Sequence, residues 1–124
     1  MTTLKRILIV DDEVSITETL AECVGPEYTV EIAHDGTEAV RAIARTRPDV
    51  VLLDLNMPGL TGLDVLHWLR ILDPSLAVLM ITATDDRAAA AAALKAGAFS
   101  YIPKPFNVKY IQNLVAAAIT SNAK

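Results

Sequence analysis

The chain has 124 residues, one cysteine and a formal net charge of −4 with a pI near 5.0, and its length predicts one domain over residues 1–124. The acidic balance argues against direct binding of nucleic acid, because contacts to phosphates need a basic surface. The lone Cys23 and the lack of a long apolar run near the start argue against an internal disulfide, a signal peptide and a membrane span, so we expect a cytoplasmic protein.

Short apolar runs alternate along the chain with amphipathic segments. Residues 7–10 and 50–53 are uninterrupted apolar runs too short for helices, which is typical of strands buried on both faces of a sheet. Between such runs, apolar residues recur at helical spacing, as Ile16, Leu20 and Val24 do. The predicted strands are residues 4–10, 28–33, 50–54, 77–82 and 99–103, and four of the predicted helices are residues 14–24, 36–47, 62–72 and 108–118. A further helix contains the alanine run 88–93, with Asp85 or Asp86 as its expected N-cap and Gly97 at its C-terminal end.

This order of five strands alternating with five helices predicts the fold class. The connections are long enough for right-handed crossovers, so the strands are expected to be parallel and covered by helices on both faces. We therefore expect an α/β, doubly wound, flavodoxin-like domain with strand order 2-1-3-4-5. The switch point of such a sheet falls between strands 1 and 3, where ligands bind at the carboxyl ends of the strands.

Polar side chains stand where four of the five predicted strands end. Asp11 and Asp12 follow the first strand, Asp54 closes the third, Thr82 ends the fourth and Lys104 follows the fifth. Three converging carboxylates raise one another's pKa unless cations compensate, and Lys104 together with a Mg2+ ion would supply that positive charge. The Asp54 carboxylate could then attack a phosphoryl group held between these cations and the Thr82 hydroxyl, and so form an acyl phosphate.

Each of these residues alone has a simpler interpretation. A lone aspartate after a strand is usually a turn former or a helix cap. Thr82 alone could be an ordinary strand residue, and Lys104 alone an ordinary solvated lysine. His34 and His67 lack a partnered carboxylate at metal or catalytic spacing, so we expect both to be solvated. The convergence of the acids, the hydroxyl and the ammonium at one edge favours phosphoryl chemistry over the simpler interpretations.

Five short motifs together resemble those of the receiver domain of bacterial two-component response regulators. The motifs are Asp11-Asp12-Glu13, Asp54 before Asn56-Met57-Pro58-Gly59, Thr82-Ala83, Gly97-Ala98-Phe99 and Lys104-Pro105. The resemblance covers essentially the whole chain, and the motifs stand in the family's order at the ends of the predicted strands. It implies a phosphorelay signalling domain that accepts a phosphoryl group from a sensor histidine kinase or a phosphotransfer protein.

The resemblance implies a phosphorylation site with a bound Mg2+ cofactor. Asp54 matches the phosphoacceptor, which also contacts the metal, and Asp11 and Asp12 match the acids that bind Mg2+. Asn56 matches the position whose backbone carbonyl is a further metal ligand.

The resemblance also implies how the signal leaves this site. Thr82 and Lys104 match the hydroxyl and the ammonium that contact the phosphate, and Tyr101 matches an aromatic switch residue that turns inward as the threonine moves. The bond between Lys104 and Pro105 matches a cis peptide of the family. The face of the fourth helix, fifth strand and fifth helix is then expected to change and to contact a second copy or an output domain. The protein is expected to catalyse only its own phosphorylation and dephosphorylation.

Three other functions stay open at this point. A Mg2+-dependent phosphatase or phosphotransferase would use the same aspartyl phosphate on an external substrate, but it needs a second acid where this chain has Asn56. A flavin-binding electron carrier of the same fold needs a phosphate loop rich in Ser, Thr and Gly, and the acids at 11–13 would repel that phosphate. A receiver-like module that binds a partner without being phosphorylated is the third.

Overall fold

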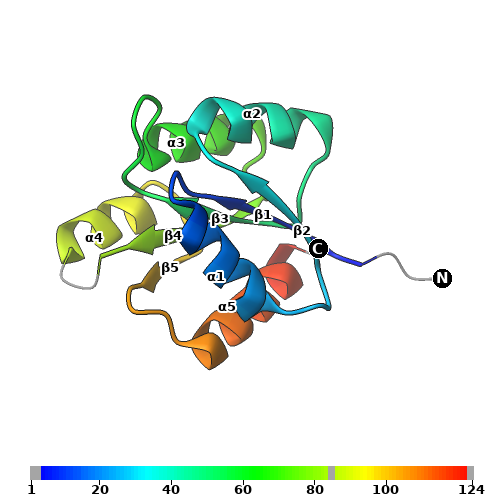
Figure 1. Cartoon of the computed structure of the whole chain (residues 1–124). Coiled ribbons are helices and arrows are strands. Elements are labelled where there is room, and N and C mark those ends of the chain that lie inside the picture. The colour runs from blue at the N-terminus through cyan, green and yellow to red at the C-terminus, as the bar shows by residue number, and fades with distance from the viewer. Residues whose placement is uncertain (1–3, 84–85, 123–124) are drawn as a thin grey trace.

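The alternating elements form a five-stranded sheet with helices on both faces (Figure 1). The computed structural model describes residues 4–83 and 86–122. Its strands are β1 (Arg6–Val10), β2 (Thr29–Ala33), β3 (Val50–Asp54), β4 (Ala77–Thr82) and β5 (Ser100–Pro103). Its helices are α1 (Val14–Val24), α2 (Gly36–Arg45), α3 (Gly62–Leu72), α4 (Arg87–Lys95) and α5 (Val108–Asn122). All ten predicted elements are therefore present, with differences only at their ends.

The strands are all parallel and follow the order β2-β1-β3-β4-β5, which confirms the predicted topology. The register pairs Val10 with Leu53, Leu53 with Met80, and Thr82 with Pro103. Because parallel strands end at the same edge of a sheet, this register brings the residues that end or follow β1, β3, β4 and β5 to one place.

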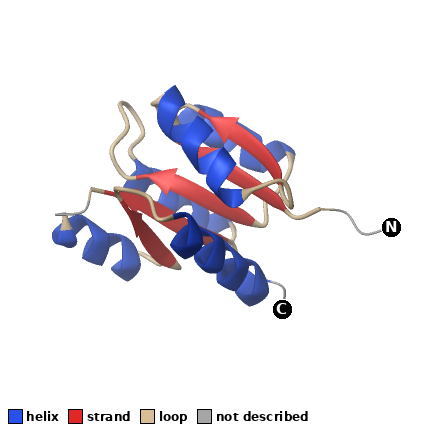
Figure 2. Ribbon diagram, turned by 60° about the horizontal axis from the view of Figure 1, so that its bottom comes forward, coloured by secondary structure: helices blue, strands red, loops and turns tan. Residues whose placement is uncertain are grey.

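The helices bury their apolar faces in two cores, one on each side of the sheet, and Figure 2 shows helices on both sides of the strands. One core joins the strands to α2, α3 and α4, with Leu66 of α3 and Ala93 of α4 fully buried in it. The other core joins the strands to α1 and α5 through residues such as Leu20 and Val115. Cys23 lies in this second core, as its place on the apolar face of its helix indicates.

Side chains cap the beginnings of α2, α3 and α4. Asp35 accepts a hydrogen bond from the Glu38 N–H at 2.7 Å, and Thr61 and Asp64 form a reciprocal capping box. The Asp86 carboxylate accepts a hydrogen bond from the Ala89 N–H at 3.0 Å, which confirms it as the expected cap, and α4 begins at Arg87; Asp85 lies outside the described residues. None of the described helices combines the length and the apolar character needed to cross a membrane.

The loop after β3 folds back against the end of its own strand. The Gly62 N–H donates a hydrogen bond to the Leu55 carbonyl at 3.1 Å, so α3 begins directly beside the strand end. A Cβ at Gly62 would lie 2.0 Å from the Asp54 carbonyl oxygen and 2.8 Å from the Leu55 Cα. Both are backbone atoms that cannot rotate aside, so this close approach requires glycine.

Gly62→Ala is expected to lower the free energy of unfolding by about 2–3 kcal/mol, because its methyl group must push the backbone at the end of β3 aside. Gly59→Ala is the matched control, since a Cβ there meets no atom within 4 Å and only the backbone φ of +76° opposes it. That control should lose about 1 kcal/mol. Urea unfolding measures both values, and equal losses would contradict the close-contact explanation.

Candidate functional site

Three aspartates from two neighbouring strands meet at the carboxyl edge of the sheet. Asp11 and Asp12 follow β1, and Asp54 ends β3 beside it. One carboxylate oxygen of each lies within 4.8 Å of those of the other two. Asp11 is fully buried, Asp54 is 7% exposed and Asp12 is exposed. The structure thus brings together the three acids as predicted.

The two buried carboxylates are only partly satisfied by hydrogen bonds. Asp11 Oδ1 accepts from the Glu13 N–H at 2.9 Å, and Asp54 Oδ1 accepts from the Asn56 N–H at 3.3 Å. The Asp11 Oδ2 is buried, and no described residue donates a hydrogen bond to it. A buried oxygen of this kind calls for a further partner, because an unpaired buried acceptor costs free energy.

Burial and mutual repulsion raise the pKa of both buried carboxyl groups. The pKa of Asp54 is raised to about 6, first by burial and then by the negative charge of Asp11, while the Asn56 N–H and the charge of Lys104 oppose the rise. The pKa of Asp11 is raised by burial, against the hydrogen bond from the Glu13 N–H. A bound cation would relieve both effects, since it favours the ionised carboxylates.

The three acids offer the ligands that a hard divalent cation prefers. All three possible ligand atoms are carboxylate oxygens. Mg2+ prefers oxygen ligands, whereas softer metals prefer the sulfur of cysteine or the nitrogen of histidine. The Asp11 Oδ2, a possible metal ligand, accepts no hydrogen bond from a described residue. On both grounds these residues fit Mg2+.

Thr82 and Lys104 reach the same edge from β4 and β5. Thr82 is 3% exposed, and its carbonyl accepts a hydrogen bond from the Lys104 N–H at 3.1 Å. The charge of the Lys104 ammonium opposes the rise in the pKa of Asp11 and Asp54. Lys104 nevertheless forms no salt bridge with another described residue. The Lys104–Pro105 peptide bond is cis, as the motif implies. The ammonium thus lies near the acids without being paired to one of them.

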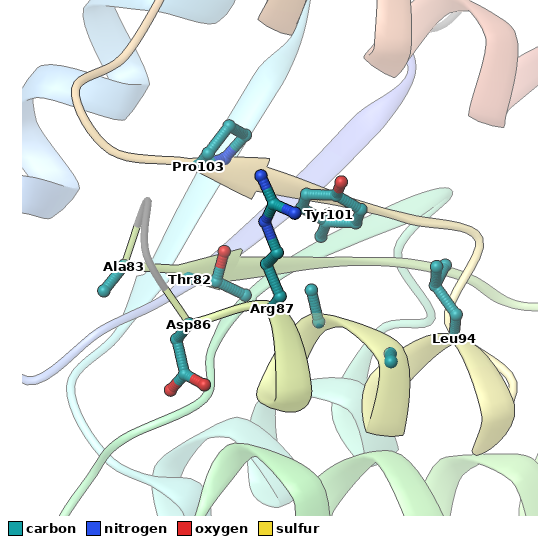
Figure 3. A pocket seen from close by; sticks show the side chains of 9 residues that line it. Thr82, Ala83, Asp86, Arg87, Leu94, Tyr101 and Pro103 are labelled. Atoms are coloured by element: carbon teal, nitrogen blue, oxygen red, sulfur yellow. The ribbon is translucent and has the colours of Figure 1, made fainter.

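A groove of 530 Å³ opens beside this site between α4 and β5 (Figure 3). Thr82 and Tyr101 both line it, Thr82 from β4 and Tyr101 from β5. Tyr101 is half-buried, and its backbone carbonyl accepts a hydrogen bond from the Tyr110 hydroxyl at 3.1 Å. The two residues expected to act as a switch therefore share one groove, and the inward turn of Tyr101 stays a prediction.

His34 is a neighbour of the site to which the sequence analysis assigned no role. It is half-buried rather than fully solvated, and its Nδ1 lies 3.2 Å from the Asp11 carbonyl oxygen. The predicted strand order could have revealed this neighbour, because β1 pairs with β2 and Val10 lies beside Ala33. The residue after β2 must then lie beside the residue after β1.

Comparison with known proteins agrees with this geometry. A family model for the response regulator receiver domain matches residues 7–116. Response regulator MprA of Mycobacterium ulcerans (strain Agy99) is 47% identical over 102 residues, which are 82% of this chain and 44% of that protein. MprA of Mycobacterium tuberculosis (strain ATCC 25618 / H37Rv) is 46% identical over 102 residues, with the same coverage of 82% and 44%. The chain thus spans less than half the length of these relatives.

Two solved structures have the same fold. The receiver domain of NtrX from Brucella abortus superposes with a TM-score of 0.88 at 32% identity, covering 92% of this chain and 98% of that one. A response regulator receiver domain protein from Clostridium thermocellum gives a TM-score of 0.85 at 34% identity, covering 94% and 95%. With the family match over most of its length and the expected side chains at the ends of four strands, the chain belongs to the response regulator receiver domain family.

Proposed function

We propose that this chain is a phosphorylation-dependent signalling switch that accepts a phosphoryl group on Asp54. The observation that carries the proposal is the cluster of three carboxylates within 4.8 Å at the carboxyl edge of the sheet. Asp54 is buried at the end of the central strand β3, Thr82 ends the neighbouring β4, and Lys104 follows β5. This set combines a nucleophile, a cation site, a hydroxyl and an ammonium, which is what transfer of a phosphoryl group to a carboxylate needs.

In the proposed reaction an Asp54 carboxylate oxygen attacks the phosphorus in line with the bond to the donor. A P–O bond to Asp54 forms while the donor's bond to phosphorus breaks, and the electron pair leaves with the donor, which takes up a proton from water. Bound Mg2+, held by Asp11, Asp12, Asp54 and the Asn56 carbonyl, would neutralise charge on the phosphoryl oxygens. The Lys104 ammonium neutralises charge from the β5 side, and the Thr82 hydroxyl donates a hydrogen bond to the new phosphate.

The switch follows from the charge that the phosphate adds. An acyl phosphate brings about −2 charge to one point, and the Thr82 hydroxyl is drawn toward it. Because Thr82 and Tyr101 line one groove, a displacement of Thr82 changes the space open to the Tyr101 ring. The face formed by α4, β5 and α5 is the surface that changes for a partner, whether an output domain or a second copy.

The proposed partners and cell compartment follow from the family. A sensor histidine kinase or a phosphotransfer protein supplies the phosphoryl group, and the relatives named response regulators are more than twice as long as the matched segment. We place the protein in the cytoplasm, which the single buried Cys23 and the absence of a membrane-spanning helix in the described residues support.

An enzyme that turns over an external phosphate ester is the less favoured alternative. Asn56 offers an amide where such an enzyme needs an acid to protonate the leaving group. The proposal is therefore that the chain catalyses only its own phosphorylation and dephosphorylation.

Asp54→Asn is expected to abolish phosphoryl uptake, because an amide is not a nucleophile toward phosphorus. Intact-mass spectrometry after incubation with acetyl phosphate and Mg2+ should show one added phosphoryl group on the wild type and none on the variant. Asp35→Asn is the control, since asparagine caps α2 as well as aspartate does. Unchanged uptake by Asp54→Asn would refute the assignment.

Asp11→Asn and Asp12→Asn are each expected to weaken Mg2+ binding by roughly tenfold or more, because each removes a unit of charge next to the cation. A Mg2+ titration followed by amide NMR shifts measures the affinity. Glu13→Gln is the control, since Glu13 contributes its backbone N–H to this cluster and its exposed side chain is not part of it. An equal loss in the control would mean that general charge, not ligation, sets the affinity.

The Asp54 carboxyl is expected to titrate near pH 6 in the metal-free protein, compared with about 3.9 in a model peptide. Asp11→Asn should lower this pKa by removing a negative charge, and Lys104→Met should raise it by removing a positive one. Carbonyl 13C NMR follows the titration directly. A higher Asp54 pKa in Asp11→Asn, or a lower one in Lys104→Met, would contradict the electrostatic explanation.

The same raised pKa makes stability depend on pH. Between about pH 4 and pH 6 the folded chain holds the Asp54 proton more tightly than the unfolded chain, so this group's contribution to stability is lost as the pH rises through about 6. In metal-free buffer, Asp54→Asn should therefore unfold at a higher temperature than the wild type at pH 7, and the difference should shrink toward pH 4. A variant less stable than the wild type at pH 7 would overturn this expectation.

A further inference from the structure

The backbone of Asp11 forms two hydrogen bonds with the residues that end and follow β2. Its N–H donates to the Ala33 carbonyl at 3.1 Å. Its carbonyl oxygen lies 3.2 Å from Nδ1 of the His34 ring. The Asp11 carbonyl belongs to the peptide group that joins Asp11 to Asp12, so the His34 ring holds the link between two members of the carboxylate cluster.

The direction of the bond from the ring follows from its partner. A carbonyl oxygen accepts hydrogen bonds and has no proton to donate, so Nδ1 of His34 is the donor. In a neutral imidazole only one nitrogen carries a proton, and this contact therefore places that proton on Nδ1 and leaves Nε2 without one. The ring acts here as a side-chain donor to the backbone of Asp11.

The beginning of α2 holds His34 in place. The His34 N–H donates a hydrogen bond to Glu38 Oε1 at 3.3 Å, and the Glu38 N–H in turn donates to Asp35 Oδ1 at 2.7 Å. Gly36 packs closely on the loop after β3, since a Cβ there would lie 2.5 Å from the Leu60 Cβ. The half-buried His34 ring thus extends from a packed and capped turn.

A Mg2+ site is sensitive to the orientation of the peptide between Asp11 and Asp12. Mg2+ demands near-ideal octahedral geometry, so its ligands tolerate little displacement. Asp11 is fully buried and its Oδ1 accepts from the Glu13 N–H, whereas Asp12 is exposed. Because packing does not enclose the Asp12 side chain, the position of its carboxylate depends on the backbone that carries it.

We propose that His34 is a positioning residue of the cation site. Its Nδ1–H holds the peptide between Asp11 and Asp12 in the orientation that lets both carboxylates bind one Mg2+. His34 acts through Asp11 and not as a ligand, because the described side chains close enough to share an ion are the three aspartates. The inference rests on the proposed function and deepens it, since it adds a residue that controls the affinity of the same site.

A different role for His34 would be to stabilise only the turn between β2 and α2. Loss of the ring would then lower the free energy of unfolding and leave the Mg2+ affinity of the folded chain unchanged. A positioning role predicts a lower Mg2+ affinity in a chain that is still folded, because a hydrogen bond that orients a metal ligand contributes to metal binding. The two roles therefore differ in a measurable quantity.

The test compares two substitutions of His34 in the full chain. His34→Leu removes the donor and keeps a branched side chain of similar size, whereas His34→Asn keeps an N–H donor at the position of Nδ1. His67→Leu is the matched control, since His67 is exposed on α3 and is not part of the carboxylate cluster. Urea unfolding establishes that each variant is folded under the conditions of the titrations.

Mg2+ titrations followed by amide NMR shifts measure the affinity of each chain. His34→Leu should bind Mg2+ roughly tenfold more weakly than the wild type, and His34→Asn should recover most of that loss. His67→Leu should bind Mg2+ as the wild type does. Uptake of a phosphoryl group from acetyl phosphate is measured on the same wild-type sample.

A second measurement needs no metal and no variant. In long-range 1H–15N correlation spectra of the metal-free wild type, the neutral His34 ring should carry its proton on Nδ1. The 13C resonance of the Asp11 carbonyl should then move in His34→Leu, which lacks the donor, and return toward its wild-type position in His34→Asn. This readout tests the proposal even where His34→Leu does not fold.

Several results would overturn the proposal. They are a neutral ring protonated on Nε2, wild-type Mg2+ affinity in folded His34→Leu, a loss in His34→Asn as large as in His34→Leu, or an equal loss in His67→Leu. Any of these in a wild type that binds Mg2+ and takes up a phosphoryl group overturns this inference alone. A wild type that does neither overturns the proposed function.

Discussion

Asp11 and Asp54 hold two carboxyl groups with at most 7% of their surface exposed, and both lie within 4.8 Å of Asp12. Taking such groups out of water and placing them together raises their pKa, to about 6 in the case of Asp54. Other groups of the site oppose this rise in pKa. The Lys104 ammonium, which follows β5, supplies positive charge, and the Glu13 and Asn56 N–H groups donate hydrogen bonds. A bound cation would supply further positive charge. In the proposed reaction, that cation would keep Asp54 ionised and therefore nucleophilic.

The sheet makes this cluster possible because it is buried on both faces and parallel throughout. Apolar cores above and below pack on β1 and β3, which pair in one register, so their carboxyl ends lie side by side. Gly62, which has no side chain, allows α3 to begin in close contact with the Asp54 carbonyl at the end of β3. The pairing of β1 with β3 thus brings Asp11 and Asp12, which follow β1, close to Asp54 at the end of β3.

Acidic residues are confined to the first 86 positions of the chain, and the segment that builds α4, β5 and α5 contains none. A groove opens between α4 and β5, lined mainly by apolar side chains together with Thr82, Asp86 and Arg87. Thr82 stands at the border, with its carbonyl bonded to the Lys104 N–H and its side chain lining the groove. Thr82 is therefore the residue that the proposed switch shares between the phosphorylation site and the groove.

The sequence alone determined the order of elements, the parallel sheet and the identity of the side chains at its edge. These follow from local patterns, because the length of an apolar run decides strand or helix and the crossover rule decides the sheet. It also indicated the three acids as a cation site, since the strands that precede them had to end together. The start of α4 was predictable in the same way, because Asp86 is one of the two aspartates expected to cap it.

Only the tertiary structure decided the quantities on which the chemistry depends. The 4.8 Å spacing, the unpaired Asp11 Oδ2 and the rise in the Asp54 pKa are products of packing between segments far apart in the chain. The predicted strand order already placed His34 beside Asp11, but only the structure showed that its Nδ1 lies 3.2 Å from the Asp11 carbonyl oxygen. The groove beside Tyr101 exists only once α4 has docked on the sheet. Composition and spacing specify which groups are present, whereas distance and burial arise from the fold.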